Sequence, residues 1–188
     1  MKLIIKLIVF SLLLTSCYTT KGLSNKISQN PMSLNATILT GLYENRILGD
    51  EENSLWNDLC IHNPDKKQNI AQGNQVFISY TEERSIMAEL YQDNVLLDTM
   101  VLKGKPKEKF FVIRKGSHFF TLVFITSIQT KKTIIGNDAN ADLLIAQGIS
   151  HSTMFLEDEV DNDDEVITGV YMRRGDTRPQ RGTLKASN

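Results

Sequence analysis

The chain has few of the residues that build metal centres, disulfide frameworks or catalytic triads. It contains two cysteines, Cys17 and Cys60, and three histidines in 188 residues. No Cys or His pair has the spacing of a zinc site, and no Gly-x-Ser-x-Gly motif marks a nucleophilic serine. We therefore expect no catalytic residue, no metal ligand and no cofactor-binding residue.

Basic charge and long apolar runs are also scarce. The 21 Lys and Arg are balanced by 22 Asp and Glu, so nothing predicts the basic face that nucleic-acid binding needs. The longest apolar stretch runs from Leu3 to Leu14, is interrupted by Lys6, and falls short of the roughly 20 residues of a membrane-spanning helix. Its length and its flanking lysines are typical of a signal peptide.

The end of this stretch, Leu14-Thr15-Ser16-Cys17, resembles the lipobox of bacterial lipoproteins. The resemblance implies a signal peptide at residues 1–16, cleavage before Cys17, and acylation of Cys17. Stable anchoring needs more than one acyl chain, and a lipoprotein cysteine carries two or three. Tyr18 follows where an inner-membrane retention signal has Asp, which favours the outer membrane. The stretch up to Asn30 has no acidic residue of the kind that some surface-export signals use, so we expect the periplasmic face, with the cell surface as the alternative.

The rest of the chain divides by composition into a tether, one domain and a tail. Residues 17–33 are rich in Thr, Ser, Asn and Lys and predict a flexible tether with a reach on the order of 20 Å. Residues 34–174 are the size of one domain. Residues 175–188 are basic and interrupted by Gly and Pro, which predicts a disordered tail.

The domain is rich in short runs of Val, Ile, Phe, Tyr and Thr, which favour strands. Asp93-Asn94, Lys115-Gly116-Ser117 and Asn137–Asn140 are typical turn sequences between such runs. Evenly spaced strands joined by turns predict an all-β fold, an antiparallel barrel or alternatively a β-sandwich. The candidate strands are Leu34–Tyr43, Gln75–Tyr80, Ser85–Tyr91, Val95–Lys103, Lys109–Arg114, His118–Ser127, Thr133–Gly136, Leu143–Ala146, Ser150–Leu156 and Glu165–Arg173.

One short helix is predicted near residues 54–61. Ser54 is a suitable N-cap, and Pro64 lies where a helix would stop. The helix would carry Cys60 as a small core residue on an apolar face with Leu55, Trp56 and Leu59. Cys60 and His62 would point in different directions, which argues against a thiol–imidazole pair.

The body also resembles calycin-like lipoproteins, which are lipocalin-like barrels. Their first strand opens with a Gly-x-aromatic motif, and Gly41-Leu42-Tyr43 fits that position. In such barrels a basic residue near the end of the chain lies close to the aromatic ring, and Arg173 fits that role. The resemblance implies a calycin-like antiparallel barrel and a binding function.

Residues 157–165 contain seven acidic residues in nine positions. A cluster of like charges predicts a long, solvated hairpin loop. The alternative for an oxygen-rich segment is a cation site.

Apolar residues occur on both faces of the predicted hairpin from Lys109 to Ser127. Phe110 and Val112 alternate with Phe111 and Ile113, so neither face would meet only water. We expect a barrel whose interior is largely filled, and an outer face that is covered by the helix around Trp56, another strand layer or a partner.

Together these features predict a non-enzymatic, lipid-anchored envelope protein that binds a small apolar ligand or a protein partner. The alternative is a structural or assembly component of an envelope complex, and an enzyme ranks third. The partners expected are the membrane, through Cys17, and such a ligand or envelope protein.

We predict that Cys17 is acylated, because the lipobox ends there. Cells fed a clickable palmitate analogue should incorporate it into this protein. Undiminished labelling of a Cys17→Ser variant would contradict the prediction.

Overall fold

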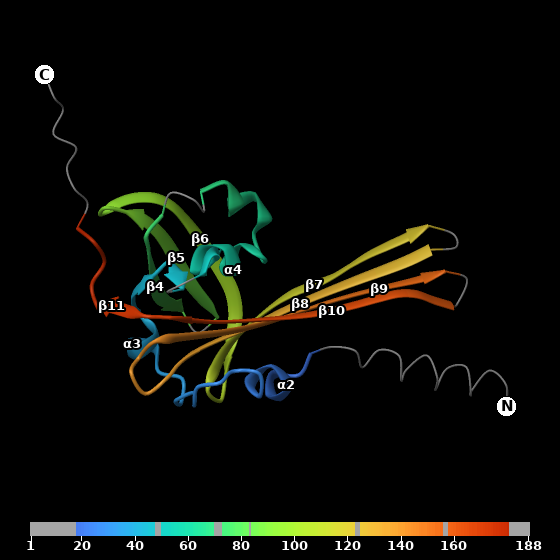
Figure 1. Cartoon of the computed structure of the whole chain (residues 1–188), viewed down its shortest axis with the longest axis horizontal. Coiled ribbons are helices and arrows are strands. Elements are labelled where there is room, and N and C mark those ends of the chain that lie inside the picture. The colour runs from blue at the N-terminus through green and yellow to red at the C-terminus, as the bar shows by residue number, and fades with distance from the viewer. Residues whose placement is uncertain are drawn as a thin grey trace, which may run out of the picture.

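The computed structural model describes residues 18–47, 50–69, 73–82, 84–122, 125–155 and 158–180 (Figure 1). Antiparallel strands make up most of this part of the chain, which confirms the all-β fold class. Three short α-helices accompany them, α2 (Thr20–Ser24), α3 (Ala36–Leu39) and α4 (Leu55–Cys60), with a 3₁₀ helix, η1 (Pro64–Asn69). None of the helices described is long and apolar enough to cross a membrane.

Nine strands form one sheet in the order β10-β9-β8-β7-β6-β5-β4-β1-β11, and β2 pairs with β3 separately. Neighbours from β4 to β10 in this order are also neighbours in the chain, so the sheet is a meander. The strands are β1 (Gly41–Glu44), β2 (Arg46–Ile47), β3 (Asp50–Ser54), β4 (Gln75–Glu82), β5 (Ser85–Gln92), β6 (Val95–Lys107), β7 (Phe110–Leu122), β8 (Ile125–Asn137), β9 (Leu143–Phe155), β10 (Asp158–Tyr171) and β11 (Arg173–Gly175).

The two ends of the strand order are joined by a single residue of chain. β10 pairs with β9, and after Met172 the chain continues as β11, which pairs with β1 at the other end of the sheet. The strand order itself stays open. The sheet nevertheless curls so far that the continuous chain of β10 and β11 forms the edge strand at both ends of the sheet (Figure 1).

A sharp change of partner occurs within β6. Its residues up to Lys103 pair with β5, and its residues from Gly104 to Lys107 pair with β7. A Cβ atom on Gly104 would lie 2.5 Å from the Val112 carbonyl oxygen, closer than any side chain tolerates. Glycine therefore allows the strand to pass from one half of the sheet to the other.

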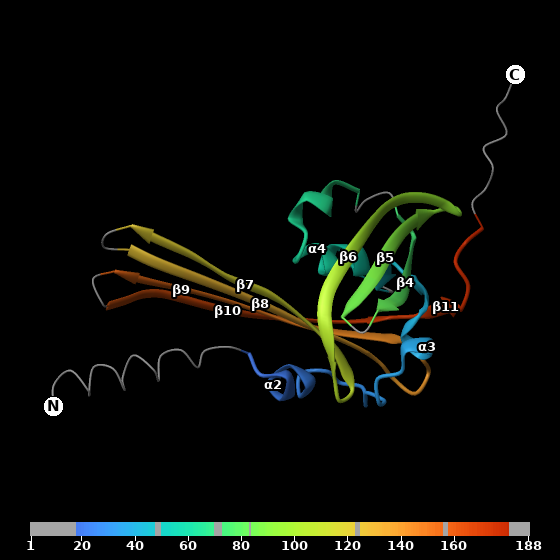
Figure 2. The ribbon, with the colours of Figure 1, turned by 180° about the vertical axis from the view of Figure 1, so that it is seen from behind.

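Strands β7 to β10 form a long four-stranded ribbon that extends away from the rest of the body (Figures 1 and 2). The turn predicted at Lys115-Gly116-Ser117 is wrong, since these residues lie inside β7. The pairing with β8 shifts register between Lys115 and His118 and then continues. A β-bulge thus accommodates the turn-forming residues within one strand.

The solvated loop predicted at residues 157–165 is also wrong for the part that the structure describes. Residues from Asp158 onward belong to β10 and pair with β9. β10 is the outermost strand of the ribbon, and charged residues are common on such edge strands because they discourage pairing with other chains.

The inner face of the curled sheet encloses the main core. α4 contributes Leu55, Trp56, Leu59 and Cys60, which are all fully buried, so the predicted helix and its apolar face are confirmed. Ser54 caps the helix, accepting a hydrogen bond from the Asn57 backbone N–H at 3.1 Å. Buried residues from eight strands pack with α4, among them Tyr43, Ile78, Ile86, Leu102, Phe111, Ile135, Ile145 and Tyr171.

A second, smaller apolar cluster lies on the outer face of the ribbon. Phe110, Val112, Ile134 and Ala146 are buried there beneath Leu23 of α2. α2 and α4 lie on opposite sides of the ribbon in both views (Figures 1 and 2). Both faces of the Phe110–Ile113 stretch are therefore covered, as predicted, but the outer cover is the N-terminal segment rather than the Trp56 helix.

This packing differs from the flexible tether predicted at residues 17–33. From Tyr18 onward the segment contacts the sheet, and Lys132 Nζ donates to the Tyr18 carbonyl oxygen at 2.7 Å. Tyr18 and Ile27 pack against the outer cluster on either side of Leu23. These scattered apolar residues outweigh the polar composition that suggested a tether. Cys17 lies outside the described residues.

The predicted disordered tail at 175–188 is likewise partly attached. Gly175 belongs to β11, and the Arg178 guanidinium lies 5.5 Å from the Phe77 ring centroid and 2.7 Å from Glu89 Oε2. Residues 181–188 lie outside the described part.

Leu23→Ala tests whether the N-terminal segment is part of the folded domain. Leu23 is fully buried, so truncation should lower the free energy of unfolding by about 2–4 kcal/mol in urea denaturation. Ser28→Ala, at an exposed position of the same segment, should change it by less than about 0.5 kcal/mol. Equal and negligible effects of the two variants would show that the segment is a free tether.

Candidate functional site

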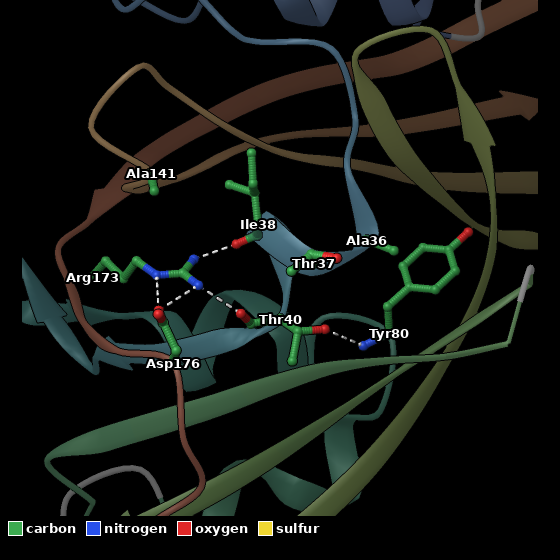
Figure 3. A pocket seen from close by; sticks show the side chains of 8 residues that line it. All are labelled: Ala36, Thr37, Ile38, Thr40, Tyr80, Ala141, Arg173 and Asp176. Atoms are coloured by element: carbon green, nitrogen blue, oxygen red, sulfur yellow. Dashed lines mark hydrogen bonds and ion pairs between the residues drawn. The ribbon is translucent and has the colours of Figure 1, made fainter.

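A pocket of about 630 Å³ lies where α3, β4, the β8–β9 turn and β11 meet (Figure 3). Its position is set by the junction between the first and last strands of the sheet. Eight residues line it: Ala36, Thr37, Ile38, Thr40, Tyr80, Ala141, Arg173 and Asp176.

α3 forms one wall of the pocket because Asn35 caps it. The Asn35 side-chain oxygen accepts hydrogen bonds from the backbone N–H groups of Thr37 at 2.8 Å and Ile38 at 3.3 Å. The predicted strand Leu34–Tyr43 is therefore only partly correct, since its first half is helical and β1 begins at Gly41. The capping asparagine is the sequence signal that would have revealed the helix.

The Arg173 guanidinium makes four hydrogen bonds and an ion pair within the protein. Nε and Nη2 contact Asp176 Oδ1 at 3.0 and 2.9 Å, and Nη2 also donates to the Thr40 carbonyl at 2.7 Å. Nη1 donates to the Ile38 carbonyl and, at 3.0 Å, to the Tyr43 hydroxyl. Figure 3 shows the guanidinium between Asp176 and the end of α3.

The Arg173 guanidinium also lies over the Tyr43 ring, 5.6 Å from its centroid. This is the contact that the calycin-like resemblance implies for these two residues. The Tyr43 hydroxyl donates to the Leu39 carbonyl at 2.9 Å and accepts from Asn137 Nδ2 at 3.1 Å, and burial raises the pKa of Tyr43 above its usual value. Tyr43 thus connects α3, β1 and β8.

Gly41 leaves the space that Arg173 occupies. A Cβ atom at Gly41 would lie 2.8 Å from Arg173 Cζ. The glycine and the tyrosine of the Gly41-Leu42-Tyr43 motif therefore serve one purpose, which is to seat the guanidinium on the aromatic ring.

The β8–β9 turn holds the backbone at the same junction. Asp142 Oδ1 accepts from the Arg173 backbone N–H at 2.8 Å, and Asp138 Oδ1 accepts from the N–H groups of Asn140 and Asp142, both at 2.9 Å. The turn predicted at Asn137–Asn140 is confirmed.

A second polar cluster lies inside the core, where it ties α4 to the ribbon. The Tyr171 hydroxyl donates to Asp58 Oδ2 at 2.6 Å, and Gln147 Nε2 donates to the Asp58 carbonyl at 2.6 Å. His62 Nε2 and Thr133 Oγ1 lie 2.7 Å apart at hydrogen-bond distance, and Gln147 also donates to Thr133 Oγ1 at 3.1 Å. All five residues are at most 5% exposed, so the cluster is closed to solvent.

Sequence reasoning missed this cluster. The available signal was the pair of polar residues Thr133 and Gln147, each of which lies next to an apolar run of its strand and which are Cα partners across β8 and β9. Buried polar groups of this kind are generally paired with one another.

Cys60 is a free, fully buried thiol, as predicted. Burial raises its pKa to about 12, so it stays protonated at neutral pH and is a poor nucleophile. Among the described residues, no group of three or more His, Cys, Asp or Glu side chains could hold a metal ion.

Comparisons of the chain with protein-family models, with curated proteins and with solved structures give no match. The geometry alone therefore defines what the two polar sites can do. In both, the donors and acceptors are directed at neighbouring elements of the same chain, so the arrangement holds strands and helices together.

Gly41→Ala should destabilise the protein by about 1–3 kcal/mol, because the added methyl group overlaps the Arg173 guanidinium. Thermal or urea unfolding measures this. Gly175→Ala is the matched control, since a Cβ atom there meets nothing within 4 Å. If the two variants were equally stable, Arg173 would not be packed on Gly41.

Proposed function

We propose that the chain is a bacterial lipoprotein, anchored through Cys17 to the outer membrane and facing the periplasm, whose body is a non-enzymatic module that binds a protein partner. The lipobox residues Leu14 to Cys17 support the anchor. The observation that supports a protein partner is a filled interior beneath an apolar row on the outer surface.

We also propose that the body is a calycin-like barrel. β10 runs directly into β11, and β11 pairs with β1, so the last strand reaches the first one. The contact of Arg173 with Tyr43 and the carbonyls of α3 supports closure at the same point.

The filled interior favours a protein partner over an enclosed ligand. α4 occupies the space inside the curled sheet with Trp56, Leu55 and Leu59 fully buried. The polar groups within the core are paired with one another, which also argues against a catalytic role.

The outer surface of β1, β4, β5 and β6 carries the apolar row. The row has one residue from each of these strands. Side chains alternate along a strand, and the residues next to these four point into the core, so the four side chains point outward. Val101 is 55% exposed and is the Cα partner of Met87 on the next strand. The outer row consists of Leu42, Phe77, Met87 and Val101, and Glu89, the Cα partner of Phe77 on β5, interrupts it.

Neighbouring residues cover one part of the outer row and leave the other open. Arg178 lies over Phe77, which is only 6% exposed. Met87 and Val101 form the open end. Apolar side chains grouped on a surface are typical of protein interaction sites.

A small apolar ligand is the second candidate, and the pocket beside Arg173 favours it. Ala36, Ile38 and Tyr80 provide apolar surface in a volume of about 630 Å³. A structural role in an envelope complex is the third, and it would use the same outer row as the proposed partner.

A photoreactive benzoyl-phenylalanine at Val101 in intact cells tests the partner. It should yield one discrete protein adduct, and the same residue at Asp65, which is exposed on η1, should yield none. A Met87→Glu change beside it should remove the adduct. The absence of any Val101 adduct in cells that anchor the protein normally would contradict the proposal.

Native mass spectrometry distinguishes a small apolar ligand from a protein partner. A bound apolar molecule that is retained by the protein and lost in Ala36→Trp, which fills the pocket, would favour a ligand over a protein partner.

A further inference from the structure

We infer that the outer face of β7, β8 and β9, together with α2, lies flat against a phospholipid bilayer. The body would then be docked on the membrane surface rather than suspended from it. This inference rests on the lipid anchor proposed above and goes beyond it by assigning the surface that meets the lipid.

The first argument is the attachment of Tyr18. Its carbonyl oxygen accepts a hydrogen bond from Lys132 Nζ at 2.7 Å, and Lys132 is itself only 7% exposed. Its ring lies against Gly148 of β9, where an added Cβ atom would approach Tyr18 Cδ2 to 2.3 Å. The glycine therefore makes room for the aromatic ring on the outer face of the sheet.

The second argument is chain connectivity. Cys17 is bonded to Tyr18, and consecutive Cα atoms are about 3.8 Å apart. Acyl chains on Cys17 must reach the hydrocarbon of the bilayer. Tyr18 is attached to β9, so insertion of the acyl chains brings the outer face of the sheet to the membrane. No flexible segment then separates the lipid from the sheet.

The third argument is the charge of the segment that lies between the sheet and the proposed bilayer. Lys21 and Lys26 are exposed, and the chain has no acidic residue from Tyr18 to Tyr43. Arg114, two residues after Val112 on the same face of β7, is also exposed. Among the side chains that the structure describes on β10, Asp164 is an exposed acidic residue on the same face as Val166 of the outer cluster.

Basic residues next to a lipid anchor strengthen attachment to anionic phospholipids. Each lysine contributes about a fivefold gain in binding at an anionic surface. The face that carries α4 and η1 lies on the other side of the ribbon from α2 and would point away from the lipid (Figures 1 and 2).

Fluorescence quenching in vesicles tests the docking. The lipidated protein is reconstituted into phosphatidylethanolamine–phosphatidylglycerol vesicles that contain a nitroxide-headgroup lipid. A dye is attached at Asn25→Cys, next to α2, or at Asp65→Cys on η1, both exposed positions. Cys60 stays unlabelled because it is buried and its pKa is raised to about 12.

The docked arrangement predicts severalfold stronger quenching at position 25 than at position 65. Lys21→Glu combined with Lys26→Glu should reduce the quenching at position 25. The control change Lys67→Glu, at an exposed position of η1, should leave it unchanged.

Equal quenching at the two positions in vesicles that carry the protein would overturn the docking and leave the anchor intact. A protein that fails to float with the vesicles would contradict the anchor itself, and the docking with it.

Discussion

The junction between the first and last strands depends on the Arg173 guanidinium. It hydrogen-bonds Asp176, the carbonyls of Ile38 and Thr40 and the Tyr43 hydroxyl, and it lies over the Tyr43 ring. A lysine could not replace it, because a single ammonium group has three donors and no flat face to stack on an aromatic ring. Gly41 and Asn35 are needed for the same contact, one to admit the guanidinium and the other to form the helix that receives it.

The sequence was most informative where local chemistry decides the structure. The helix at residues 54–61 follows from its cap and its apolar spacing, and the Asp93-Asn94 turn follows from two residues that tolerate positive φ, which are 50° and 67° here. The contact between Tyr43 and Arg173 followed from resemblance, because a pairing across 130 residues has no local signal.

The incorrect sequence predictions have a different cause. Gly116 with Ser117, and the acidic residues from Asp158 onward, have the composition of loops. They form strands because the neighbouring strand supplies a continuous hydrogen-bond ladder, which composition cannot reveal. The N-terminal segment was misjudged in the same way, since its few apolar residues count only when the outer cluster is there to receive them.

The two faces of the ribbon bear on different possible functions. The inner face packs against α4 and carries a polar cluster whose groups hydrogen-bond one another. The outer face carries the N-terminal segment and, in our proposal, the membrane. The outer row on β4 to β6 is then the surface through which the protein would meet a partner.

Hydrogen exchange of Arg173→Lys tests most directly whether the guanidinium donors hold the first and last strands together. The variant keeps the charge and loses the five-donor geometry. Our account predicts faster exchange of the backbone amides in α3, β1 and β11, including Glu44, which donates to the Met172 carbonyl at 2.9 Å, with unchanged exchange in β8 and β9. Unchanged protection of α3, β1 and β11, or a uniform loss across the whole sheet, would contradict it.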